Sequence, residues 1–62
     1  MESIHEIKYS FLHCKHPMEI INSMYPNFYD TEKPEATNRL LFLKKIEADD
    51  RFDELNKMIK NN

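Results

Sequence analysis

The chain has 62 residues, which is enough for one domain with a small hydrophobic core. Nine basic and eleven acidic residues give a net charge of −2 at pH 7, which excludes a general electrostatic attraction to nucleic acid or anionic membranes. Glycine is absent, so phosphate-binding loops lack the residue that they depend on, and the single cysteine excludes a disulfide within the chain. Leu, Met, Glu and Lys are frequent and Val is absent, which favours helices over strands.

The first predicted helix covers residues 4–14. Ser3 and Glu6 have the spacing of a capping box, in which the serine caps the helix and the glutamate follows three residues later. The apolar residues that follow have helical spacing: Ile4, Ile7 and Phe11. Alternation of apolar and polar residues over 7–11 would also suit a strand, but the cap favours the helix.

The second predicted helix covers residues 17–25. Pro17 suits the first position of a helix, and Pro26 ends the segment. Residues 26–33 form a linker, after which Pro34 opens the third helix.

The third helix is predicted over residues 34–47 and a fourth over 50–60. Asp49 or Asp50 could cap the fourth helix, because aspartate is favoured at that position. Since no glycine or proline forces a break, one continuous helix that reaches Met58 is the alternative.

A helical wheel drawn through residues 34–60 gives one normal core face. That face comprises Leu41, Ala48, Phe52, Leu55 and Ile59. Phe42, Leu43 and Ile46 fall on the opposite side, so residues 40–46 are apolar nearly all round. These three side chains either complete the core or form a surface for self-association or for a protein partner.

Tyr25, Phe28 and Tyr29 place three aromatic side chains in or beside the linker. Tyrosine is enriched among residues that contribute interface energy, so the segment is a candidate recognition loop. The alternative is that it folds inward as a lid over a thin core.

His13, Cys14 and His16 form the one cluster of metal-ligand residue types, with His5 upstream. Structural zinc sites usually pair two short ligand motifs, and no second motif follows downstream. The same residues could serve as a thiol and its base, but no oxyanion hole or third orienting group is evident. We therefore expect no metal, no cofactor and no catalytic residue.

DNA binding is the alternative function, because the helices can be drawn as a helix-turn-helix. The linker 26–33 is longer than the turn of that motif, and Arg39, Lys44 and Lys45 point in separate directions on the wheel. The sequence therefore argues against nucleic acid as a partner.

No membrane association is expected. The longest apolar run, residues 40–43, is far shorter than the roughly 20 residues that span a bilayer. Residues 1–6 lack the features of a signal peptide, and the lone thiol suits a reducing compartment, so the sequence predicts a cytoplasmic protein.

The sequence thus predicts a single all-α domain, a small bundle of three or four short helices that self-association could complete. Its expected function is that of a non-enzymatic interaction module, a small regulator or inhibitor that occludes a surface of a larger protein. The candidate partner-binding residues are Tyr25, Phe28, Tyr29, Phe42, Leu43 and Ile46.

Overall fold

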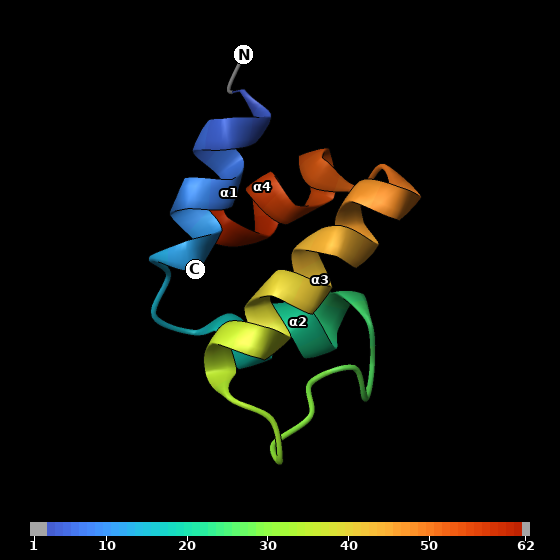
Figure 1. The fold of residues 1–62 in the computed structure, drawn as a ribbon. Coiled ribbons are helices and arrows are strands. Elements are labelled where there is room, and N and C mark those ends of the chain that lie inside the picture. Colours follow the sequence, from blue (N-terminus) through green and yellow to red (C-terminus); the bar gives the residue numbers. More distant parts are fainter. Residues whose placement is uncertain (1–2, 62) are drawn as a thin grey trace.

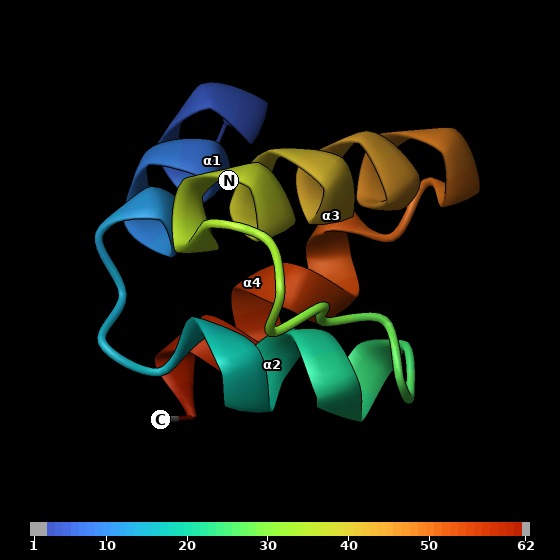
Figure 2. The ribbon, with the colours of Figure 1, turned by 60° about the horizontal axis from the view of Figure 1, so that its bottom comes forward.

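The computed structural model describes residues 3–61 and folds them into four α-helices. These are α1 (Ile4–Leu12), α2 (Pro17–Met24), α3 (Glu35–Asp49) and α4 (Phe52–Lys60). The described residues contain no strand, which confirms the predicted all-α bundle. In Figure 2, α1 and α3 lie at the top, α2 lies at the bottom and α4 lies between them. Figure 1 shows the long connection that joins α2 to α3 at one end of the molecule.

The predicted cap of α1 is present. The Ser3 hydroxyl accepts a hydrogen bond from the backbone N–H of Glu6 at 3.2 Å, which satisfies one of the free donors at the start of the helix. α1 is helical as expected but ends at Leu12, two residues earlier than the predicted end at residue 14. His13 is the C-cap, and its Nδ1 lies 2.9 Å from the carbonyl oxygen of Tyr9.

The connection between α2 and α3 is held by one buried side chain. Asn38 in α3 is 1% exposed and accepts a hydrogen bond from the backbone N–H of Asp30 at 2.8 Å. Its Nδ2 donates to the carbonyl oxygens of Asp30, Lys33 and Pro34 at 2.9, 3.3 and 3.1 Å. A buried amide with all these partners fixes the loop against the first turn of α3.

α3 and α4 are separate helices, and Asp50 marks the break. Asp50 adopts a left-handed conformation with φ 53°, where glycine is more usual. The backbone N–H groups of Asp50 and Arg51 donate to the carbonyls of Glu47 and Ile46, which is the hydrogen-bond pattern of a Schellman motif. The prediction that Asp49 or Asp50 caps α4 is wrong, because Arg51 occupies the N-cap without a side-chain hydrogen bond.

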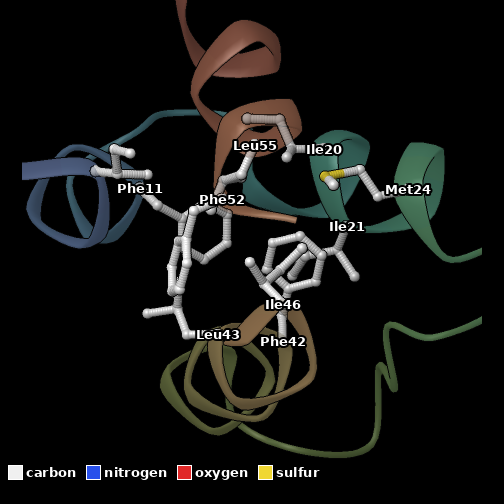
Figure 3. Close-up of a cluster of buried hydrophobic side chains, with 10 residues drawn as sticks. Phe11, Ile20, Ile21, Met24, Phe42, Leu43, Ile46, Phe52 and Leu55 are labelled. Atoms are coloured by element: carbon white, nitrogen blue, oxygen red, sulfur yellow. The ribbon is translucent and has the colours of Figure 1, made fainter. Parts of the chain in front are cut away.

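Every helix contributes side chains to one core (Figure 3). The rings of Phe11 in α1 and Phe42 in α3 pack with their centroids 5.0 Å apart. Ten apolar residues are buried: Ile7, Phe11, Ile20, Ile21, Met24, Phe42, Leu43, Ile46, Phe52 and Leu55.

The core face predicted for α3 is wrong. Leu41 is 39% exposed and Ala48 is also exposed, whereas the opposite face of α3 supplies Phe42 and Ile46 to the core. The helical wheel assumed one continuous helix through residues 34–60. The left-handed conformation of Asp50 ends α3, so residues of α3 and α4 do not share one helical face. The predicted face is therefore correct for Phe52 and Leu55 in α4 but reversed for α3.

None of the helices within residues 3–61 combines the length and the apolar character needed to cross a bilayer. The prediction that residues 1–6 lack a signal peptide includes residues 1–2, which lie outside the described residues.

Candidate functional site

The structure buries the α3 residues that were candidates for partner contact. Phe42 and Ile46 have no exposed surface and Leu43 has 6%. Of the two alternatives for these side chains, the structure therefore supports the intramolecular core. Phe42 and Ile46 therefore form no surface in the folded chain, and Leu43 contributes only a small exposed area.

The three candidate aromatic residues near the linker are half-buried and pack against the same core. Tyr25 lies beside Phe28 and Phe42, with ring centroids 5.8 Å apart in each pair, and Phe28 lies 6.2 Å from Phe42. The backbone N–H of Tyr29 donates to the side-chain oxygen of Asn22 in α2 at 3.3 Å. The segment thus covers one side of the core, which agrees with the lid alternative.

The hydroxyl of Tyr25 joins the lid to the break between α3 and α4. It donates a hydrogen bond of 2.7 Å to the carboxylate of Asp49, and the guanidinium carbon of Arg51 lies 4.8 Å from the ring centroid. Burial and the hydrogen bond to the carboxylate raise the pKa of Tyr25, and the guanidinium offsets part of that rise.

Arg51 also pairs with Glu54 at 2.7 Å and donates to the carbonyl oxygen of Met24 at 3.3 Å. The hydrogen bond from Arg51 lowers the pKa of Glu54. Together these contacts tie the start of α4 to the end of α2.

The raised pKa of Tyr25 predicts a change of stability at alkaline pH. Stability that depends on the protonated phenol is fully present below the unfolded pKa of about 10 and is lost as the pH rises through the higher folded pKa. We expect Tyr25→Phe to lower the free energy of unfolding by about 1 kcal/mol at pH 7 and to flatten its decline above about pH 10. Urea denaturation followed by circular dichroism across this range measures both effects.

Tyr9→Phe is the matched control for that experiment, since Tyr9 is exposed on α1. An alkaline decline that is the same in the wild type and in Tyr25→Phe would contradict the role given to the Tyr25 hydroxyl.

The cluster of metal-ligand residue types is split between separate roles. His13 stacks on Tyr9 with centroids 4.2 Å apart and caps α1, while Cys14 and His16 line a hollow of about 180 Å³ at the turn between α1 and α2. Lys15, Ile20 and Ile59 complete that hollow. Within residues 3–61, no three His, Cys, Asp or Glu side chains come close enough to hold one metal ion.

Arg39, one of the basic residues of the DNA-binding alternative, forms its hydrogen bonds and its ion pair with other parts of the chain. Its guanidinium donates to the carbonyl oxygens of Phe11 and Cys14 at 2.9 and 3.1 Å and also to that of Leu12. The same group pairs with Glu35 at 2.6 Å. Arg39 therefore satisfies the carbonyl groups at the end of α1 and joins α1 to α3.

An open groove lies between α1 and α3, and sequence analysis did not identify it. It has a volume of about 320 Å³ and is lined by Lys8, Leu12, Leu40, Leu43, Lys44 and Glu47. We call it the α1–α3 groove. Leu12 from α1 and Leu40 from α3 are 41% and 56% exposed, and the buried Leu43 also lines the groove.

The charged residues of the α1–α3 groove differ in their partners. Lys8 pairs with Glu47 across the two helices at 3.4 Å. The side chain of Lys44 forms no ion pair or hydrogen bond with any part of the chain that the structure describes. The groove thus combines exposed leucines with an ammonium group that is free to pair.

Comparisons of this chain with protein-family models, with curated proteins and with solved structures found no match. The geometry of the described residues is therefore the basis for a functional proposal.

Proposed function

We propose that this chain is a non-enzymatic protein-interaction module, which regulates or inhibits a larger protein by occluding part of its surface. The contact is the α1–α3 groove, and Leu43 alone of the six residues that the sequence suggested lines it. The observation that supports this most strongly is the exposure of Leu12 and Leu40 in one groove while ten other apolar residues complete the core.

Exposed leucines that are scattered singly are normal on protein surfaces and need no explanation. Leu12 and Leu40 differ because they line the same hollow from two different helices. Lysine and glutamate side chains surround them, which gives the apolar centre and polar rim that are usual for protein interfaces. Burial of these side chains would supply affinity, and the charged rim would supply selectivity.

The proposal is tested by affinity capture from native cells, followed by titration calorimetry with the purified partner. We expect Leu40→Glu to weaken binding about 20-fold or more, because it replaces buried apolar surface with a charge. Circular dichroism should show that this exposed substitution leaves the helices intact.

Met18→Glu is the matched control, since Met18 is 47% exposed on α2 and does not line the groove. A partner that is retained by Leu40→Glu, or lost equally with both variants, would contradict the assignment of the contact to the α1–α3 groove.

A further inference from the structure

The α1–α3 groove has the length of a short helical contact. Its residues on α3 run from Leu40 to Glu47, which corresponds to two helical turns or roughly 10 Å along the axis. Apolar side chains at positions i and i+4 of a partner helix are roughly 6 Å apart along its axis, so both fit within this length. Such a helix can set these side chains beside Leu12 and Leu40.

The charges of the groove indicate which charge the partner helix should carry beside its apolar residues. Glu47 is already paired with Lys8, so the rim has one charge without a partner among residues 3–61, the ammonium group of Lys44. Leu40 and Lys44 are four residues apart and therefore neighbours on the surface of α3. A carboxylate on the partner would lie within reach of Lys44 when an apolar side chain rests on Leu40.

We infer that the α1–α3 groove binds a two-turn amphipathic segment of a partner helix, whose apolar residues are flanked by an Asp or Glu that pairs with Lys44. This inference rests on the proposed function and specifies the chemistry of the partner.

A second copy of the chain fits the groove less well. A two-fold interface brings the same patch of each copy together, so two concave surfaces would meet and the Lys44 side chains would approach one another. An anionic membrane is disfavoured by the net charge of −2.

The inference is tested with a displayed library of helical peptides, about four turns long, in which the apolar and flanking positions are randomised. Selection on the wild-type protein is expected to enrich apolar residues at i and i+4 together with Asp or Glu at one flanking position. Selection on Lys44→Glu is expected to enrich Lys or Arg at that position instead. The dissociation constant of a selected acidic peptide should rise about 5- to 10-fold with Lys44→Glu.

Lys33→Glu is the charge-matched control, because Lys33 is exposed in the loop before α3 and does not line the groove. It should leave the dissociation constant unchanged. Leu40→Glu should abolish binding of every selected peptide.

The variants separate this inference from the proposed function. If Leu40→Glu abolishes binding but Lys44→Glu leaves the peptide preference unchanged, the groove is a contact surface and the acidic flank is wrong. If Leu40→Glu binds the peptides as tightly as the wild type, both proposals fail. If sedimentation equilibrium shows that the wild type is a dimer and Leu40→Glu is a monomer, the occupant is a second copy of the chain and the inference is overturned. If the wild-type protein sediments with phosphatidylserine vesicles and Lys44→Glu does not, the occupant is a membrane surface and the inference is overturned.

Discussion

Phe42→Ala is expected to lower the free energy of unfolding by about 3–5 kcal/mol, because it removes a fully buried ring and leaves a cavity. The ring of Phe42 packs against those of Phe11, Tyr25 and Phe28, so the cavity would open where α1, α3 and the lid meet. A chain of this length has roughly 3–5 kcal/mol of stability from its core, so the variant should be largely unfolded at room temperature. Circular dichroism and urea denaturation measure the loss.

Leu41→Ala supplies the control for Phe42, since the two residues are adjacent on α3 and Leu41 is partly exposed. Its substitution should cost less than about 1 kcal/mol. A larger loss from Leu41→Ala than from Phe42→Ala would mean that α3 presents its other face to the core, as the helical wheel had predicted.

Arg39→Ala is expected to lower the free energy of unfolding by about 3 kcal/mol, because it removes the guanidinium that donates to the carbonyl oxygens of Phe11, Leu12 and Cys14. Arg39→Lys should recover only part of this loss, since an ammonium group cannot reproduce the planar fork of the guanidinium. Thermal and urea denaturation compare both variants with Lys44→Ala, which removes a lysine from the same helix.

The loss from Lys44→Ala should be within about 0.5 kcal/mol, as is usual at exposed positions. Arg39 variants that are as stable as the wild type but lose binding to duplex DNA would contradict the structural role of Arg39 and support the DNA-binding alternative.

The helices of this chain could be predicted because their signals are local. Ser3 with Glu6, and proline at position 17, identify two starting points in the sequence alone, and both starts agree with the structure. The break at Asp50 has a weaker signal, because only the left-handed conformation of a non-glycine residue produces it. The sequence left one helix or two as alternatives for that reason.

The face that α3 buries could not be predicted from periodicity. Residues 40–46 are apolar nearly all round, so the choice between Leu41 and Phe42 depends on where the other three helices lie. The α1–α3 groove could not be predicted either, because Leu12 and Leu40 line the same groove only once α1 and α3 are packed in the fold.

The role of Arg39 has no sequence signature at all. Its acceptors are backbone carbonyl oxygens, which every residue supplies, so no complementary side chain indicates the contact in advance. The carboxylate of Glu35 also pairs with Arg39, and a helical pattern could suggest this contact because Glu35 lies four residues earlier.

The capping of α1 by Arg39 also affects how the chain folds. The acceptor carbonyl of Phe11 lies 28 residues before Arg39 in the sequence, so the end of the first helix is completed by a side chain from the second half of the protein. An N-terminal fragment that stops before α3 would lack both the Arg39 donor for the carbonyl groups at the end of α1 and the Phe42 ring that packs on Phe11. The helices should therefore form and melt together as one cooperative unit, and a ribosome-bound chain should acquire protection from hydrogen exchange in α1 only after α3 has emerged.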